Sequence, residues 1–122
     1  MPHLTLEYTR NLDGFPVGDT LLAINETLFE SGEVQAESDL KSRAIALDAV
    51  QIGTAGGARG FVHVQLRLLA GRTPEAKKAL TERIAVVLRA RTPKPAGMLV
   101  QLSVEVADMD RDSYVKEKLP QA

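Results

Sequence analysis

The chain has 122 residues, of which 44% are hydrophobic and 25% charged, a composition that fits one compact domain and excludes an intrinsically disordered chain. A formal charge of −1 at pH 7 gives no overall attraction to nucleic acid or anionic membrane, and no apolar run approaches the ~20 residues of a membrane span. With no cysteine, a disulfide framework, a thiol nucleophile and a thiolate metal site are excluded. We therefore expect a cytoplasmic protein without a nucleic-acid or membrane partner.

The first segment, residues 2–8, alternates between apolar and polar side chains, which predicts a strand with one buried side. Its apolar face carries Pro2, Leu4, Leu6 and Tyr8. Two interpretations of the proline are open. It either starts an edge strand, where proline is tolerated, or it becomes a free secondary amine once Met1 is removed.

Residues 17–32 have apolar side chains at helical spacing and predict a helix of three or four turns. Asp19 or Thr20 is the candidate N-cap, and Gly32 is the candidate stop. The predicted apolar face consists of Leu21, Ile24, Leu28 and Phe29.

Residues 40–53 contain the β-branched residues Ile45, Val50 and Ile52 and begin with alternation, which predicts a second strand. The glycine-rich stretch 53–60 cannot continue either kind of element. It lacks the strand-to-helix context of a phosphate-binding loop, so we expect a hairpin-like connection there.

The second half of the chain repeats this arrangement. Residues 61–69 alternate as a strand, and residues 71–90 predict a helix with Thr73 as N-cap and Pro74 at the first helical position. Residues 98–106 return as the most regular strand. The predicted inner face of the second helix consists of Ala76, Leu80, Ile84, Val87 and Leu88.

The order β-α-β therefore occurs twice. His3 and His63 lie 60 positions apart at equivalent places in their strands, so we expect an internal repeat of about 2–52 and 60–107 within one domain of 122 residues. Two such units predict an α+β fold with a four-stranded sheet and both helices on one face. The other face stays open, which favours a symmetric oligomer. Residues 108–122 form a charged C-terminal tail.

Three cations are candidates for binding a carboxylate. Lys41 and Arg43 project from the same side of the second strand, and Arg72 stands at the start of the second helix. By themselves these patterns are typical of solvated surface. Two histidines do not make a metal site, and we expect no metal and no cofactor.

Several stretches resemble the 5-carboxymethyl-2-hydroxymuconate isomerase family of the tautomerase superfamily. They are "MPHLTLEYTRNL", "LKSRAIAL" and "GFVHVQLRLLAGRTPEAKKAL", and the similarity extends from Pro2 to about Glu105. The resemblance implies a pair of β-α-β units, a homotrimer, and a mature chain that begins at proline. It also implies an isomerase of aromatic compound catabolism, in homoprotocatechuate degradation.

By this resemblance Pro2 is the catalytic base, which moves a proton on an unsaturated 2-hydroxy acid from oxygen to carbon. Arg72 matches the arginine of the family's "AGR" motif and would bind a substrate carboxylate. Where the family has an arginine before "SR" this sequence has Lys41, so either Lys41 or Arg43 supplies the second cation.

Two alternatives remain open from the sequence. One is another activity of the same superfamily, a keto-enol tautomerase acting on a phenylpyruvate-like acid or a decarboxylase of a small 3-oxo acid. The other is a non-catalytic oligomeric module that binds a ligand or partner through its open sheet.

Overall fold

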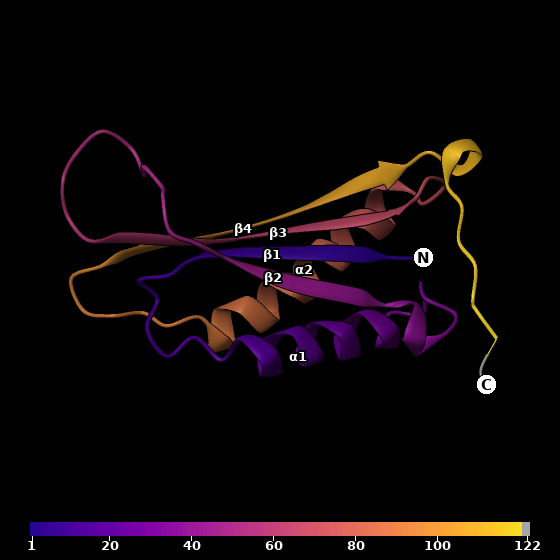
Figure 1. The fold of residues 1–122 in the computed structure, drawn as a ribbon, viewed down its shortest axis with the longest axis horizontal. Helices are drawn as coiled ribbons and strands as arrows, with labels where there is room; N and C mark the ends of the chain where they lie inside the picture. The colour runs from indigo at the N-terminus through magenta and orange to yellow at the C-terminus, as the bar shows by residue number, and fades with distance from the viewer. Residues whose placement is uncertain (121–122) are drawn as a thin grey trace.

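A mixed four-stranded sheet in the order β2-β1-β3-β4 forms the centre of the computed structural model, which describes residues 1–120. Strand β1 (His3–Thr9) pairs in parallel with β2 (Lys41–Leu47) and antiparallel with β3 (Arg59–Leu69). Strand β3 pairs in parallel with β4 (Leu99–Met109). Two parallel pairs therefore meet at an antiparallel centre (Figure 1), which confirms the predicted fold.

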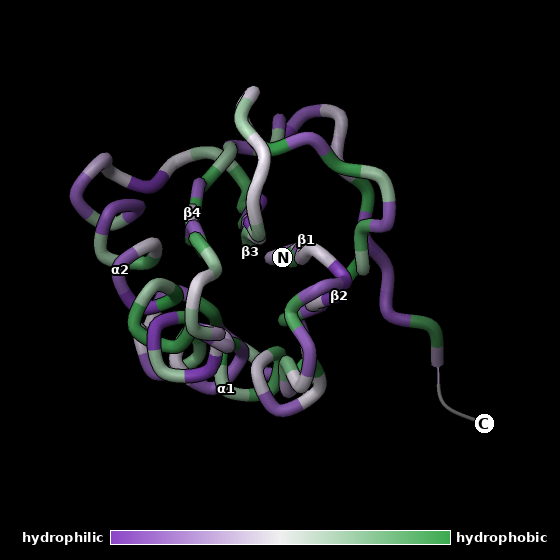
Figure 2. The backbone as a smooth tube through the Cα atoms, turned by 90° about the vertical axis from the view of Figure 1, so that its left-hand side faces the viewer, coloured by the Kyte–Doolittle hydropathy of each residue, from purple (hydrophilic) through white to green (hydrophobic). Residues whose placement is uncertain are grey.

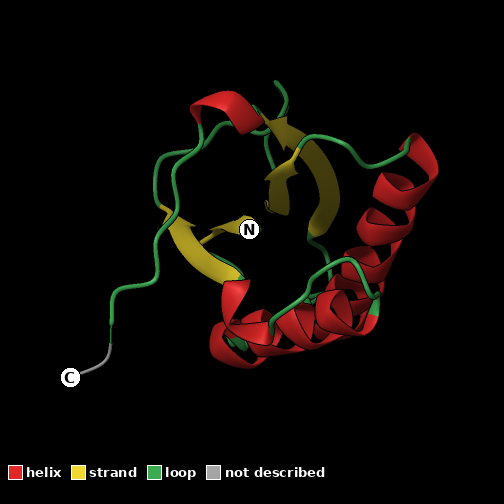
Figure 3. Ribbon diagram, turned by 90° about the vertical axis from the view of Figure 1, so that its right-hand side faces the viewer, coloured by secondary structure: helices red, strands yellow, loops and turns green. Residues whose placement is uncertain are grey.

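Both helices, α1 (Val17–Glu30) and α2 (Pro74–Arg91), cover one face of the sheet. Figure 3, viewed from the end at which the chain begins, shows the two helices together on one side of the curved strands. Hydrophilic and hydrophobic residues alternate along their turns in Figure 2, as expected for helices with one buried side. The opposite face of the sheet is covered by no helix among residues 1–120, as predicted.

The core lies between the sheet and the helices and follows the predicted alternation. Leu4 and Leu6 of β1 are at most 1% exposed, as are the four alternate apolar residues of β3. Because β1 lies between β2 and β3, Pro2 precedes a central strand. The interpretation of this proline as the start of an edge strand is therefore wrong.

The two helices begin differently. At α2 the Thr73 hydroxyl accepts a hydrogen bond from the Ala76 amide at 3.1 Å, and Pro74 opens the helix, as predicted. At α1 the N-cap is Pro16, which makes no side-chain cap, and the buried Thr20 hydroxyl donates to the Pro16 carbonyl at 2.7 Å.

Several details of the predicted first helix are therefore wrong. Neither Thr20 nor Asp19 caps α1, since Asp19 instead pairs with Arg91 at 3.0 Å. Phe29 is 42% exposed and does not belong to the core. Gly32 follows the helix with a φ of 82°, a left-handed conformation that glycine adopts easily, so its role as the stop is confirmed.

The glycine-rich connection is also different from the prediction. It joins β2 to β3, and β1 lies between those two strands, so the connection crosses the end of β1 and is no hairpin. Arg59 and Gly60 already belong to β3, and the Arg59 guanidinium donates to the Ile52 carbonyl at 2.8 Å within this loop.

Residues 110–120, here called the C-terminal segment, include the short helix η2 (Arg111–Ser113) and pass the end of the sheet at which the chain begins (Figure 1). Residues 121 and 122 of the predicted tail lie outside the described residues. No helix within residues 1–120 is long and apolar enough to cross a membrane.

Candidate active site

The predicted base, Pro2, lies immediately before β1 and is buried. Its carbonyl accepts a hydrogen bond from the Lys41 amide at 3.3 Å, which ties the start of the chain to the start of β2. The proline ring faces a small apolar gap, as its position in the strand pattern predicts. The other apolar residues that line this gap are Leu28, Val34, Leu40, Leu66, Leu68 and Leu80.

A polar cavity of about 260 Å³ adjoins this apolar gap, and we call it the N-terminal cavity. Glu33 and Val34 line both spaces. Two cations and two carboxylates face the cavity. Its lining consists of Met1, Glu33, Val34, Gln35, Asp39, Leu69, Arg72 and Arg111.

In the structure the terminal amine is that of Met1, and the Pro2 nitrogen is an amide as long as Met1 is present. Burial lowers the pKa of the Met1 amino group below its usual value. The Asp39 carboxylate opposes this change, while the charges of Arg72, Lys41 and a further cation, Lys116, add to it. An amine at this end of the sheet is therefore biased towards its uncharged, proton-accepting form.

Arg72 reaches the N-terminal cavity from the connection between β3 and α2, as its predicted role requires. It is held by three hydrogen bonds. Its Nε donates to Glu33 Oε1 at 2.9 Å, one Nη donates to the Glu33 carbonyl at 2.8 Å, and the other donates to the Leu69 carbonyl at 3.2 Å. Two of the five guanidinium protons remain for a ligand.

The two cations of β2 share a sheet face, as predicted, but have different neighbours. Lys41 Nζ donates to the Asp39 carbonyl at 2.6 Å, and burial lowers the pKa of Lys41. Arg43 donates to His3 Nδ1 at 2.9 Å and to the Lys41 carbonyl at 3.2 Å. The charge of Lys41 lowers the pKa of the terminal amine and that of His3, whereas the charge of Arg43 lowers the pKa of His3.

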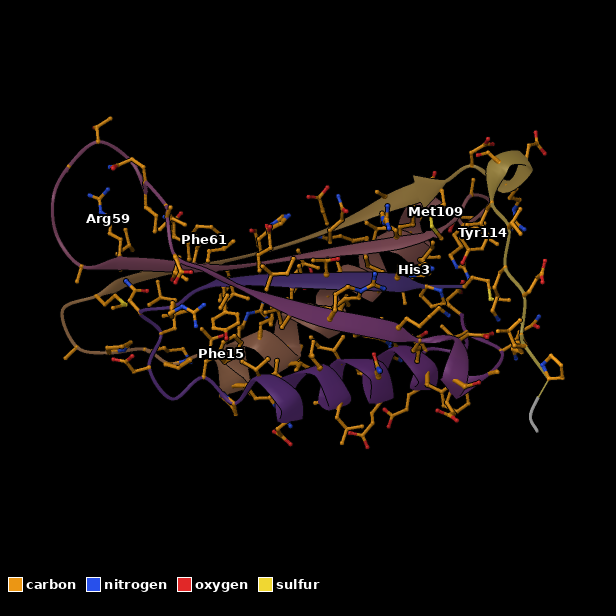
Figure 4. All side chains as sticks on the ribbon, viewed as in Figure 1. His3, Phe15, Arg59, Phe61, Met109 and Tyr114 are labelled. Carbon is orange, nitrogen blue, oxygen red and sulfur yellow. The ribbon has the colours of Figure 1, made fainter. Side chains whose placement is uncertain are left out.

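His3 connects Arg43 to the C-terminal segment. Since arginine can only donate, His3 Nδ1 accepts, and its Nε2 then donates to the Tyr114 hydroxyl at 3.0 Å. Burial lowers the pKa of His3, and the Arg43 charge lowers it further, in agreement with a neutral ring. Figure 4 shows the two labelled rings close together at the end of the sheet where the chain begins.

Sequence reasoning missed four charged residues around the N-terminal cavity. Glu33 and Asp39 lie in the connection between α1 and β2, while Arg111 and Lys116 belong to the C-terminal segment. The only local signal was the high charge of the tail, and nothing in it indicated a partner 77 positions away in the sequence.

The arrangement suits a small carboxylate. Arg72 and Arg111 face a cavity that the terminal residue Met1 also lines, and the next residue, Pro2, lines the adjoining apolar gap. Such surroundings favour an uncharged amine and bind an anion next to it. No group of three or more side chains suited to a metal ion occurs within residues 1–120.

Comparison with protein-family models gives a match to 5-carboxymethyl-2-hydroxymuconate isomerase over residues 2–119. A sequence comparison with curated proteins gives no match.

Solved structures give three informative similarities. A 5-carboxymethyl-2-hydroxymuconate isomerase from Deinococcus radiodurans R1 superposes with a TM-score of 0.84 at 27% identity, over 97% of this chain and 90% of that one. A 5-carboxymethyl-2-hydroxymuconate delta-isomerase gives 0.59 at 20% identity, over 97% and 88%. A fused 4-OT, described as a symmetric trimer, gives 0.61 at 21% identity, over 90% and 87%.

Proposed function

Since this chain belongs to the 5-carboxymethyl-2-hydroxymuconate isomerase family and is an isomerase of the tautomerase type, we propose that Pro2 is its general base once Met1 has been removed. The proposed substrate is an unsaturated 2-hydroxydienoic acid such as 5-carboxymethyl-2-hydroxymuconate. The proposed product is its 2-oxo isomer.

The observation that carries this proposal is the environment of the chain start. Pro2 is buried in an apolar wall, while the residue before it faces a cavity with cations. A terminal α-amino group has an ordinary pKa of about 7.7 to 8.0. Burial and neighbouring positive charges both lower that value, as they do for the Met1 amine. An uncharged amine near pH 7 is a suitable base.

The proposed reaction moves one proton. The uncharged Pro2 nitrogen removes the proton of the 2-hydroxyl group, and the electrons of that O–H bond form the 2-oxo group. The double bonds of the dienol shift, and carbon five takes up a proton from the Pro2 ammonium. The amine is regenerated, and the product is the conjugated 2-oxo-3-ene acid.

Arg72 and Lys41 are the proposed carboxylate-binding residues. Arg72 faces the N-terminal cavity with two unused guanidinium protons, which suits a charge-assisted contact with a carboxylate. Lys41 is among the cations whose charge lowers the pKa of the terminal amine, and Arg43 is not. This difference favours Lys41 as the second cation. Arg43 is then the residue that orients His3.

We also propose a homotrimer. The fused 4-OT that shares this fold is described as a symmetric trimer. In residues 1–120 the face of the sheet opposite the helices has no covering layer, which leaves a surface for other copies of the chain.

An ultraviolet assay of dienol loss tests the proposal. Intact mass spectrometry first establishes that Met1 is absent from the purified protein. Pro2→Ala should then lower kcat/KM by about 100-fold or more, as for loss of a general base. A variant with one extra residue before Pro2, which makes its nitrogen an amide, should be equally impaired.

The matched control is Pro95→Ala, which removes an exposed proline from the loop before β4. It should retain the activity of the unmodified protein. Equal turnover by the unmodified protein and Pro2→Ala would show that Pro2 is not the base. Turnover of an enolised phenylpyruvate or a small 3-oxo acid, with none of the dienols, would assign the chain to another tautomerase activity.

A further inference from the structure

Asp39 is the one buried charged side chain among the described residues, with only 7% of its surface exposed. It ends the short helix η1 (Glu37–Asp39) and lines the N-terminal cavity together with Met1. A buried carboxylate at this place attracts a proton to any neighbouring amine, and Asp39 does raise the pKa of the Met1 amino group. Left unpaired, Asp39 would therefore oppose the chemistry proposed above.

The C-terminal segment supplies the partner of this carboxylate. Lys116 Nζ lies 2.6 Å from Asp39 Oδ1, and its side chain is only 16% exposed. The hydrogen bond from Lys116 is the main reason why the pKa of Asp39 is lower than usual, although burial acts in the opposite direction. The segment is further anchored where the Tyr114 hydroxyl accepts from His3 and the two rings meet edge to face.

Two lysines form an ion pair with Asp39, but only Lys116 also donates a hydrogen bond to it. Lys118 Nζ also approaches Asp39 Oδ1, but at 3.6 Å, and its side chain is 66% exposed. Water screens an exposed charge much more than a buried one. Lys116 therefore provides most of the compensation for the Asp39 charge.

We propose that Lys116 is a positioning residue of the active site, which neutralises Asp39 from the C-terminal segment and so keeps the terminal amine in its proton-accepting form. The inference rests on the proposed role of Pro2. It makes the C-terminal segment part of the active site, although no residue of the segment has to touch the reacting atoms.

All charged groups that face the amine belong to this balance. Asp39 alone favours the protonated amine, and three cations from separate parts of the chain oppose it. Two further charges line the cavity, and one of them, Glu33, is already paired with Arg72. Among residues 1–120 the full set is Asp39 from η1, Glu33 from the connection between α1 and η1, Lys41 from β2, Arg72 from the connection between β3 and α2, and Arg111 and Lys116 from the C-terminal segment.

The test compares Lys116→Met with Lys118→Met, two changes that remove the same charge from the same segment. The readouts are the pH profile of kcat/KM and an NMR titration of the terminal proline nitrogen in ligand-free protein. For Lys116→Met we expect the acidic limb to move up by about half to one pH unit. At pH 6 this lowers kcat/KM by roughly three- to tenfold, with little change at pH 9.

For Lys118→Met we expect the pH profile of the unmodified protein. Lys116→Arg keeps the positive charge at position 116 and should also show the unmodified profile. Asp39→Asn removes the negative charge that favours the protonated amine. The acidic limb of its kcat/KM profile should therefore move to lower pH, and the same is expected when this change is combined with Lys116→Met. This variant tests the proposal even if Lys116→Met does not fold. A purely structural role would lower kcat/KM equally at every pH and leave the proline titration where it was.

The outcomes separate this inference from the proposed function. If Pro2→Ala is fully active, the proposed function fails, and the proline titration still decides whether Lys116 controls the amine. If Pro2→Ala is impaired but the titrations of Lys116→Met and Asp39→Asn match that of the unmodified protein, only the role of Lys116 is overturned.

Discussion

Glu33→Gln perturbs the arginine that we assign to the substrate carboxylate. Glu33 Oε1 accepts a hydrogen bond from Arg72 Nε at 2.9 Å, so a substrate carboxylate has to compete with an internal carboxylate for this arginine. The variant removes this negative charge. Arg72 keeps its position because two backbone carbonyls, those of Glu33 and Leu69, still accept from its Nη groups.

The size of the effect follows from the exposure of the pair. The Arg72 and Glu33 side chains are 19% and 36% exposed, so solvent screens their attraction in part. A partly exposed pair is worth about 0.5–1 kcal/mol, which corresponds to a two- to fivefold lower KM for a carboxylate substrate. We expect kcat to change less than twofold, because the proton transfer at Pro2 does not involve Glu33.

Steady-state kinetics on a dienol substrate measures this effect, with Glu30→Gln as the matched control. Glu30 is an exposed carboxylate at the end of α1, and its removal should leave KM unchanged. Arg72→Ala should lower kcat/KM by about 10- to 100-fold, as expected for a lost charge-assisted hydrogen bond. The Glu33→Gln effect should then vanish in the Arg72→Ala background. An undiminished effect there, or a raised KM in Glu33→Gln alone, would refute this reasoning.

Three further predictions concern folding. Gly60→Ala should destabilise the protein by about 1–3 kcal/mol in urea unfolding, since a Cβ there would lie 2.8 Å from Thr9 Oγ1; an unchanged midpoint would contradict this. Thr73→Ala should cost about 1 kcal/mol through loss of the α2 cap, whereas Thr73→Ser should cost clearly less. The ion pair with Lys116 lowers the pKa of Asp39. The stability that this pair contributes is therefore present above pH ~4 and is lost as the pH falls further. Urea midpoints at pH 6 and pH 3 should thus differ less in Asp39→Asn than in the unmodified protein.

Much of the fold could be predicted because its signals are local. Alternation along β1 and β3 identifies the buried faces, since side chains on a strand point to opposite sides in turn. The pair Thr73 and Pro74 marks the start of α2 within two residues. The N-cap of α1 was predicted wrongly because Pro16 occupies this position and makes no side-chain hydrogen bond, so the usual signal is absent.

Part of the candidate site was also open to prediction. Pro2 and Arg72 were named from their resemblance to a family, and the structure places both beside the apolar gap or the N-terminal cavity. Their chemical roles remain proposals. The sequence did not distinguish Lys41 from Arg43, because two residues of one strand face share the same local pattern. The proposed preference for Lys41 rests on the different neighbours of the two side chains in the structure.

What the amino-acid sequence by itself determined about this protein is the type of each regular element, most of the buried faces, and the residues that resemble a family motif. Only the tertiary structure decided the crossing of the glycine-rich loop over β1, the pairing of Arg72 with Glu33, and that of Asp39 with Lys116. The physical reason is the range of the interactions. Helix and strand patterns repeat over a few residues. The Arg72–Glu33 and Asp39–Lys116 pairs join positions 39 and 77 residues apart, and they exist only after the chain has folded.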